Sequence, residues 1–414
     1  MRGSKVAIIG GGAAGFFTAV NLAENCPQAD ITIYEGSTKI LSKVLVSGGG
    51  RCNVTNQISE PVELSKNYPR GQKFLISVFE KFSSNDTKKW FEERGIPLKT
   101  ENDGRVFPKS NSSQSIYNCL TQQAVRLGVK LEKSMRLWDF KSNPNGWRLS
   151  FSDNQVIDTD YLVLASGSNN KMYKLLVNKG IVITPPLPSL FTFNAENHES
   201  MIDLAGVSVP MGSAQIKEVS NSTQTGPILV THWGYSAPAI LKLSAWQART
   251  LAELDYKFTL QLNWSNKTSE ELRNEIQLLV ENHPKGKVIS WKGHNISKRL
   301  WLHIFEKSEL REFTNWSEIG KKGIKRLLNN ICNFEVRING KSIFKEEFVT
   351  CGGIALDEVN HNTLEINKLN QVYVAGEVLD IDAITGGFNF QAAWSEAHLI
   401  SQAISEKIRS HSSQ

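Results

Sequence analysis

Segments with the apolar spacing of strands and segments with the apolar spacing of helices follow one another along the chain. Their order predicts the elements of the fold. Two β-branched apolar runs, Val6–Ile9 and Ile31–Tyr34, flank Ala13–Glu24, where apolar residues recur at the spacing of one helical face. A strand, a helix and a strand in this order form a βαβ unit. Tyr161–Leu164 is a continuous apolar run, typical of a strand buried in a parallel sheet. We therefore expect an α/β domain with a parallel sheet.

The same patterns predict elements in the rest of the chain. Helical spacing predicts helices at 73–94, 113–127, 268–282, 295–305, 316–330 and 391–408. Short apolar runs predict strands at 131–140, 147–151, 191–193, 215–219, 256–262, 349–355, 364–366 and 372–375. The proline-rich stretch Thr184–Leu190 predicts a stiff crossover between domains.

This order predicts a nucleotide-binding domain that is interrupted by an insertion. We assign residues 1–188 and 349–414 to the nucleotide-binding domain. The insertion divides into a β-rich substrate domain, 189–265 and 332–348, and a small helical domain, 266–331.

Composition and charge narrow the class of protein. A chain of 414 residues, 40% of them apolar, is long enough for more than one packed core. Its formal charge is +6, but acidic residues are interleaved with the basic ones, which argues against nucleic acid as a main partner. Five cysteines without a C-x-x-C pair favour a reducing compartment. No apolar run approaches the roughly 18 residues of a membrane span, and no signal peptide precedes the first strand. We expect a cytoplasmic protein.

A glycine motif connects the first strand to the first helix. Gly10, Gly12 and Gly15 satisfy G-x-G-x-x-G, and Glu35 follows at the end of the second strand. In such a motif the first glycine permits a tight turn, the second lets the backbone approach a pyrophosphate, and the third lets helix and strand pack closely. The helix N-terminus attracts the phosphates, and Glu35 would accept hydrogen bonds from ribose hydroxyls. The motif predicts a bound dinucleotide, but it serves NAD and FAD alike.

Three further segments favour FAD. Lys43–Asn56, KVLVSGGGRCNVTN, places three glycines and a cation in an amide-rich loop. Val372–Ala397 contains a strand, an acidic turn, two glycines and a helix start. The third segment is Val230–Ala239, VTHWGYSAPA, inside the insertion.

At these segments the chain resembles the BaiN/YhiN-like family of bacterial NAD(P)/FAD-dependent oxidoreductases, which includes proteins described as aminoacetone oxidases. The likeness covers nearly the whole chain. It implies a Rossmann-type, two-part FAD-binding domain with an inserted β domain and a small helical domain. Relatives commonly have A-T-G-G where this chain has Ala165–Ser168, and S-G-P where it has Ser236–Pro238.

The resemblance also implies which residues contact FAD. Gly12, Ala13 and Ala14 would contact the pyrophosphate. Glu35 would bind the adenosine ribose, and Leu137 would pair with adenine through its backbone. The residues along the rest of the FAD would be Lys43, Arg51, Cys52, Asn53, Gly376, Glu377, Gly387, Phe388, Asn389 and Ala392. We add as expected cofactor contacts Gly36, Gly50, Thr55, Ala165, Ser166, Gly167 and Asp382.

Several residues have two interpretations. Cys52 beside Arg51 suggests a thiolate of lowered pKa, but no resolving cysteine accompanies it, so we interpret it as a packing or cofactor-shell residue. His232 is a weak candidate for a proton donor, and a surface histidine explains it equally well. Glu377, Asp380 and Asp382 resemble a metal cluster, yet ribityl contacts or helix capping explain them better, and we predict no metal.

The leading functional hypothesis is an FAD-dependent oxidoreductase that passes a hydride through flavin N5 to a small organic substrate. No second G-x-G-x-x-G is present, which suggests that NAD(P)H, if used, docks transiently as the donor, or that the reductant is the substrate itself. The alternatives are an amine or aminoketone oxidase that produces H2O2, an FAD-dependent RNA-modifying protein, and a structural protein that merely retains FAD.

Overall fold

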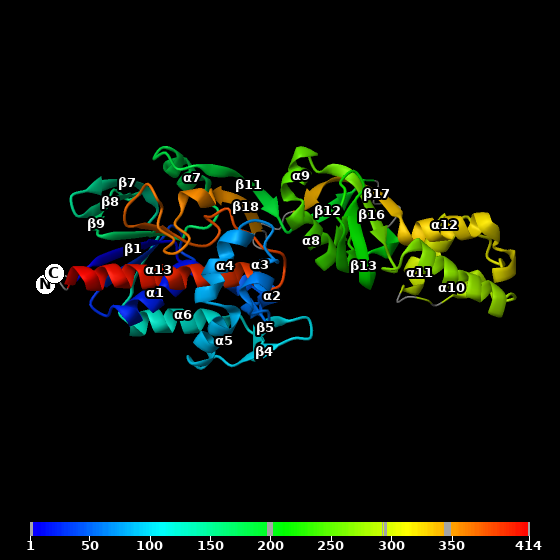
Figure 1. Ribbon diagram of the computed structural model, residues 1–414, viewed down its shortest axis with the longest axis horizontal. Coiled ribbons are helices and arrows are strands. Elements are labelled where there is room, and N and C mark those ends of the chain that lie inside the picture. Colours follow the sequence, from blue (N-terminus) through cyan, green and yellow to red (C-terminus); the bar gives the residue numbers. More distant parts are fainter. Residues whose placement is uncertain (1–2, 197–201, 292, 294–295, 343–348, 413–414) are drawn as a thin grey trace. The chain divides into compact units, whose positions relative to one another are not determined.

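The computed structural model describes residues 3–196, 202–291, 293, 296–342 and 349–412 (Figure 1). The chain divides into two compact units. Unit 1 comprises Met1–Pro188 and Phe344–Gln414, and unit 2 comprises Ser189–Ile343. The further division of the insertion into a β-rich and a helical domain stays a prediction.

Unit 1 is built on a parallel sheet of five strands in the order β19-β10-β1-β2-β6. The central strands are apolar and buried, as the sequence pattern requires of strands covered on both faces. The bounds are β1 Lys5–Ile9, β2 Asp30–Glu35, β6 Lys130–Lys133, β10 Tyr161–Leu164 and β19 Val372–Val374. The predicted α/β class is confirmed.

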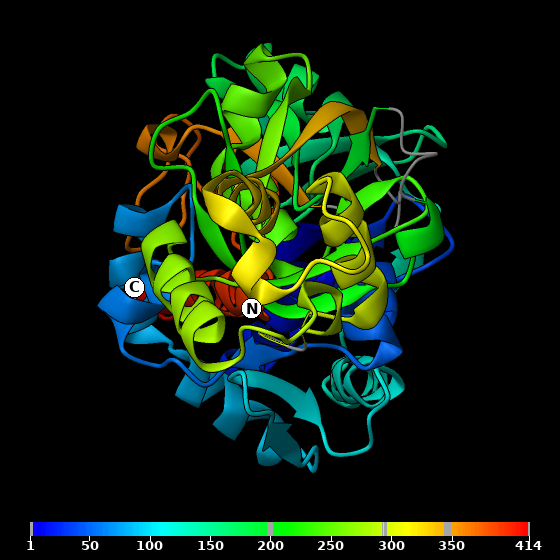
Figure 2. The same cartoon turned by 90° about the vertical axis from the view of Figure 1, so that its right-hand side faces the viewer.

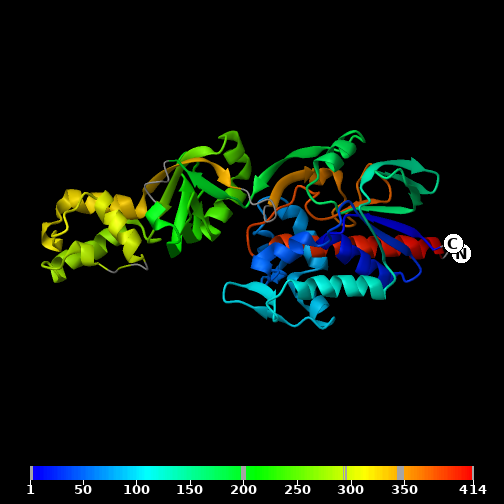
Figure 3. The same cartoon turned by 180° about the vertical axis from the view of Figure 1, so that it is seen from behind.

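Two helices from opposite ends of the chain pack together in unit 1. Helix α1, Ala13–Asn25, lies along the long helix α13, Phe388–Ser412 (Figures 1 and 3). Phe17 and Trp394 join them, with ring centroids 5.1 Å apart. The remaining helices of unit 1 are α2 Ser42–Gly50, α3 Pro61–Ser65, α4 Gln72–Lys81, α5 Ser84–Glu92, α6 Gln114–Arg126, α7 Asn170–Val177 and η4 Leu356–Glu358.

Three smaller sheets complete unit 1. The first is β3-β5-β4, the second is the meander β7-β8-β9, and the third pairs β11 with β18. The bounds are β3 Thr55–Asn56, β4 Leu98–Thr100, β5 Arg105–Pro108, β7 Leu137–Asn143, β8 Gly146–Phe151, β9 Val156–Thr159, β11 Ile183–Ser189 and β18 Val349–Ile354. The proline-rich crossover is therefore a strand.

Several predicted elements differ from the structure. The helix predicted at 316–330 is a 3-10 turn followed by a helix that begins at Gly320. The strand predicted at 131–140 is two strands, β6 and β7, because Ser134 at φ +59° turns the chain between them. The helix predicted at 73–94 is α4 and α5, because Ser83 and Asp86 form a capping box that starts a new helix. Around residues 364–366, the described chain forms only isolated bridges.

Unit 2 contains a closed antiparallel barrel with the order β12-β15-β14-β13-β16-β17. Its strands are β12 Thr192–Ala195, β13 Ser208–Ile216, β14 Gln224–Val230, β15 Gly234–Ser236, β16 Lys257–Asn263 and β17 Phe334–Ser342. Tyr235 and Trp264 are fully buried in its core.

Helices follow the barrel strands in unit 2. Helices α8 and α9 lie between β15 and β16, and three longer helices lie between β16 and β17; Figure 2 shows these three in front of the barrel strands. The bounds are α8 Pro238–Trp246, α9 Ala248–Glu253, α10 Ser269–Asn282, η2 Val288–Ser290, α11 Lys298–Lys307, η3 Trp316–Glu318 and α12 Gly320–Cys332. Asn295, where we expected a helix to begin, lies outside the described residues. No helix in the described part of the chain has both the length and the apolar character of a membrane span.

Candidate functional site

The carboxyl ends of the parallel strands form one edge of the sheet in unit 1. Hydrogen bonds continue past the strand ends and hold the following turns together. The Gly10 amide donates to the Tyr34 carbonyl at 2.8 Å, and the Ala165 amide donates to the Ile9 carbonyl at 2.8 Å. In open α/β sheets, ligands bind outside this edge.

The three motif glycines have different surroundings. A Cβ atom on Gly10 would lie 2.2 Å from the Ala165 carbonyl oxygen, and one on Gly15 would lie 2.0 Å from the Gly10 carbonyl oxygen. A Cβ atom on Gly12 would meet no protein atom within 4 Å. Gly12 is the N-cap of α1, and because glycine has no side chain, the amides of the first turn have no side-chain cap. Packing within the protein requires Gly10 and Gly15, whereas Gly12 leaves space for a phosphate at the positive end of the helix.

Glu35 stands at the end of β2 and uses both carboxylate oxygens. They accept from the Gly11 amide and from the Ser37 amide, each at 2.8 Å. Because a carboxylate has about four acceptor positions, room remains for ribose hydroxyls. The start of β7 lies nearby, since the Met135 amide donates to the Glu35 carbonyl at 2.9 Å. The structure therefore places the predicted cofactor contacts Glu35 and Gly36 beside the start of β7, which contains Leu137.

The triple glycine at the end of α2 is left-handed throughout. Gly48, Gly49 and Gly50 have φ values of +57°, +66° and +78°. Residues with a side chain rarely adopt this backbone conformation. A Cβ atom on Gly49 or Gly50 would meet nothing within 4 Å. The segment we expected to be a loop is thus a helical turn followed by an open run of backbone.

Side chains join the Lys43–Asn56 segment to the C-terminal segment. With its amide oriented to suit its neighbours, Asn53 accepts from the Gly387 amide at 2.9 Å. Thr55 Oγ1 donates to Gln391 Oε1 at 2.5 Å. Lys43 forms an ion pair with Glu377. Two of the segments that the sequence analysis singled out therefore form one region of unit 1, beside the glycine motif.

The turn after β19 contacts a buried acid of α13 that the sequence analysis missed. Gly376, at φ +80°, donates its amide hydrogen to Glu396 Oε2 at 2.6 Å. Glu396 is fully buried in α13, and its Oε1 has no hydrogen-bond partner among the described residues. Burial raises the pKa of Glu396 to about 8, while the bond from Gly376 acts in the opposite direction. An acid among the apolar residues of Ala392–Ala397 was the available signal.

The turn also faces the glycine motif. A Cβ atom on Gly376 would lie 3.4 Å from the Ala14 Cβ, and one on Gly167 would lie 3.9 Å from Glu377 Oε2. The predicted contacts on β1, β10 and β19 are therefore neighbours at one edge of the sheet. Ala13 and Ser166 occupy the same turns, at the start of α1 and after β10.

Other predicted contacts are engaged with protein groups. Arg51 pairs with Glu101 at 2.7 Å and lies over the Phe107 ring. Asp382 is buried and forms an ion pair with Arg70.

Two predicted contacts near the start of α13 also have protein partners. The Asn389 side chain bonds the backbone of Ala383 through both of its polar atoms. Phe388 is buried, and its carbonyl accepts from the Tyr68 hydroxyl at 2.6 Å. Ala392 is buried one turn further along α13. The cofactor roles of these residues stay predictions.

Cys52 is fully buried. Desolvation raises the pKa of its thiol to about 12. The lowered pKa considered for a thiolate at this position is therefore wrong, because the effect of burial exceeds that of the hydrogen bond with Ser47.

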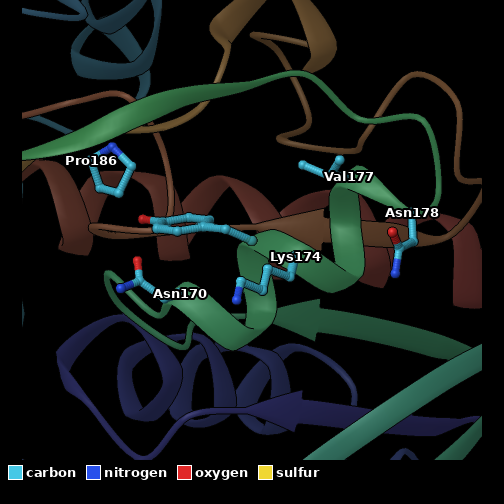
Figure 4. A pocket seen from close by; sticks show the side chains of 6 residues that line it. Asn170, Lys174, Val177, Asn178 and Pro186 are labelled. Carbon is cyan, nitrogen blue, oxygen red and sulfur yellow. The ribbon is translucent and has the colours of Figure 1, made fainter.

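A cavity of about 460 Å³ lies beside α7 (Figure 4). It is lined by Asn170, Tyr173, Lys174, Val177, Asn178 and Pro186. The Tyr173 hydroxyl donates to the Glu377 carbonyl at 3.0 Å. The cavity therefore adjoins the turn of Gly376 and Glu377.

His232 belongs to unit 2. It is exposed in the turn between β14 and β15 of unit 2. Its role as a proton donor stays a prediction. Within the described chain, no three His, Cys, Asp or Glu side chains are grouped as a metal site.

The fold and the glycine turns define a Rossmann-type FAD-binding protein. The chain belongs to the HI0933-like family, because the profile described as "HI0933-like protein Rossmann domain" matches residues 4–403. It is an FAD-dependent oxidoreductase.

Relatives that match this chain over nearly their whole length have names of two different activities. The chain is 28% identical to "Ribosomal RNA dihydrouridine synthase" of Haemophilus influenzae, over 98% of this chain and 99% of that protein. It is 25% identical to "3-dehydro-bile acid delta(4,6)-reductase" of Clostridium scindens, over 98% of this chain and 100% of that protein.

A solved structure shares the fold. The 3-ketosteroid-delta4-(5alpha)-dehydrogenase of Rhodococcus jostii RHA1 is similar with a TM-score of 0.51, at 12% identity, over 97% of both chains.

Proposed function

We propose that FAD binds along the carboxyl edge of the sheet in unit 1 and that the enzyme reduces a carbon–carbon double bond conjugated to a carbonyl group. One observation supports the proposed position of FAD above the others. Gly12, Gly49 and Gly50 leave open space where Gly10 and Gly15 are closed by protein atoms. Open backbone at a helix N-terminus suits the close approach of a pyrophosphate.

Different residues at this edge of the sheet would bind different parts of FAD. Glu35, Gly36 and Leu137 would hold the adenosine part, and Gly12 with the first turn of α1 would hold the pyrophosphate. The turns at Ala165–Gly167 and Gly376–Glu377 would bound the ribityl chain. The residues proposed near the isoalloxazine are Lys43, Gly50, Arg51, Cys52, Asn53, Thr55, Asp382, Gly387, Phe388, Asn389 and Ala392.

The relatives support the type of reaction. The names bile acid delta(4,6)-reductase and dihydrouridine synthase both denote the addition of hydrogen to a carbon–carbon double bond. Bound FAD supplies hydride transfer to such a bond, with NAD(P)H as the donor. The protein would orient the substrate carbonyl and exclude water.

A second candidate substrate is a uridine in RNA. Two relatives named ribosomal RNA dihydrouridine synthase match this chain over 98% and 95% of its length, at 28% and 27% identity. A uracil ring contains a double bond conjugated to a carbonyl, so the same flavin chemistry would serve a small enone or a nucleotide.

Re-oxidation of the reduced protein separates the candidates. The purified protein is reduced anaerobically and mixed with cyclohexenone, with unmodified ribosomal RNA, or with O2. Return of the flavin band with cyclohexenone or RNA supports the proposal and identifies the substrate class. Rapid return with O2 alone, accompanied by H2O2, contradicts it in favour of an oxidase.

A further inference from the structure

The helices of unit 2 concentrate the positive charge of the chain. Residues 266–331 contain thirteen Lys and Arg and eight Asp and Glu, a net charge of +5 against +6 for the whole chain. The acids are confined to α10 and to residues 306–318, whereas residues 282–305 and 319–334 contain none. These two acid-free stretches therefore carry only positive charge, while the exposed Glu312 and Glu318 lie beside the second.

Helix α12 carries part of this charge on its outer face. Leu327, Leu328 and Ile331 are buried in the core of unit 2. Lys321, Lys322 and Lys325 are exposed. At 3.6 residues per turn, Lys322 lies opposite these apolar residues, whereas Lys321 and Lys325 lie nearer the edge of the apolar side. In the described chain, none of these three lysines forms an ion pair.

A second basic segment is fixed beside the start of α12. The Val288 amide donates to the Thr314 carbonyl at 3.0 Å, and the Trp316 amide donates to the Gly286 carbonyl at 2.9 Å. Residues 284–288 therefore run alongside residues 314–317, which lead into α12. The exposed lysines of the two segments form what we call the basic surface: Lys285, Lys287, Lys321, Lys322 and Lys325.

An aromatic side chain adjoins this surface. Phe313 precedes the paired residues 314–317, and 73% of it is exposed. Lysines beside an exposed aromatic ring suit a nucleic acid, since phosphates bind the cations and an unpaired base stacks on the ring.

We propose that the basic surface binds the phosphate backbone of RNA. The proposal rests on the second candidate function only for the choice of RNA over other polyanions. A membrane surface fits less well, because an interfacial helix inserts its apolar face into the bilayer, and the apolar face of α12 is already buried in unit 2.

A charge reversal with a matched control tests the proposal. The FAD-loaded full chain is titrated onto a fluorescein-labelled RNA hairpin at several KCl concentrations, and anisotropy is measured. The test variant is K321E/K322E/K325E. The control is K89E/K130E/K141E, which changes the net charge equally at three exposed lysines of unit 1. An unchanged circular dichroism spectrum and unchanged thermal transitions of both units show that each variant is folded.

We expect the test variant to bind at least tenfold more weakly than the native chain and to lower the slope of log Kd against log salt by about 2, since each lost phosphate contact removes about 0.7 to 0.9. The control should change Kd less than twofold. Equal weakening in both variants, no binding by the native chain, or tighter binding to phosphatidylserine vesicles than to RNA would overturn the proposal. If RNA binds through this surface but does not re-oxidise the flavin, the docking surface stands and the RNA substrate falls.

Discussion

Glu396 is a carboxyl group buried among apolar residues of α13, with one oxygen bonded to the Gly376 amide and the other unpartnered among the described residues. Its pKa is about 8 in the folded chain and near the ordinary 4.5 when unfolded. Between these values the native state holds a proton that the unfolded state lacks. The free energy of unfolding therefore falls as pH rises through this window, by up to about 1.4 kcal/mol per pH unit.

The substitution Glu396→Gln removes the ionisation and keeps an oxygen for the Gly376 amide. We predict that Tm falls less between pH 6 and pH 9 in this variant than in the native protein. Glu406→Gln, at an exposed position of the same helix, is the control and should follow the native curve. Parallel curves for the native chain and Glu396→Gln would show that Glu396 does not hold the proton.

Cys52 provides a second prediction at this scale. A buried thiol with a pKa of about 12 carries no thiolate at neutral pH. We expect Cys52→Ala to lose some stability, because the substitution leaves a small cavity. The rate of flavin reduction by NAD(P)H should stay within about threefold of the native rate, because the substitution removes packing and no thiolate. A fall of a hundredfold in stopped-flow traces would restore a redox role.

Among the elements, the start of α1 contains two glycines with different expected roles. Gly15 serves packing, and Gly12 serves the proposed binding of FAD. Gly15→Ala places Cβ against the Gly10 carbonyl, so we expect a loss of about 1 to 3 kcal/mol of stability. Gly12→Ala meets no protein atom. We expect it to change the stability of the FAD-free protein by less than about 1 kcal/mol and to weaken FAD binding at least tenfold. Urea unfolding and fluorescence titration with FAD measure the two effects. Native FAD affinity in Gly12→Ala would place the pyrophosphate elsewhere.

The elements also show what the sequence could and could not predict. Periodicity found α1, β1, β2 and β10, because apolar runs decide long buried elements. It failed where one residue changes the direction of the chain, as at Ser134 between β6 and β7, or where a cap divides an apolar pattern, as at Ser83. Such breaks depend on the backbone conformation or the cap at one residue, and the apolar pattern continues across them.

The candidate site was predictable to a similar degree. The glycine motif and Glu35 follow from spacing alone, and the structure places them at one edge. Arg70 beside Asp382 and Gln391 beside Thr55 were not predictable, since each pair is separated by more than 300 residues and no spacing signals the contact.

At the scale of the whole molecule, the two units carry separate cores. The barrel of unit 2 closes on its own apolar cluster, and the proposed FAD residues all lie in unit 1. We predict two transitions in calorimetry of the FAD-free protein. FAD at 100 times its Kd should stabilise unit 1 by about 2.7 kcal/mol and leave the transition of unit 2 unchanged. A single transition, or an equal shift of both, would contradict separate units and a cofactor held by unit 1 alone.

The central claim is that this chain holds FAD and accepts electrons from a nicotinamide donor. The absorption spectrum of the purified protein, recorded anaerobically during titration with NADH and then NADPH, tests it most directly. The account predicts a flavin band that one of the two donors bleaches. A protein without a flavin band, or with a band that neither donor bleaches, would contradict it.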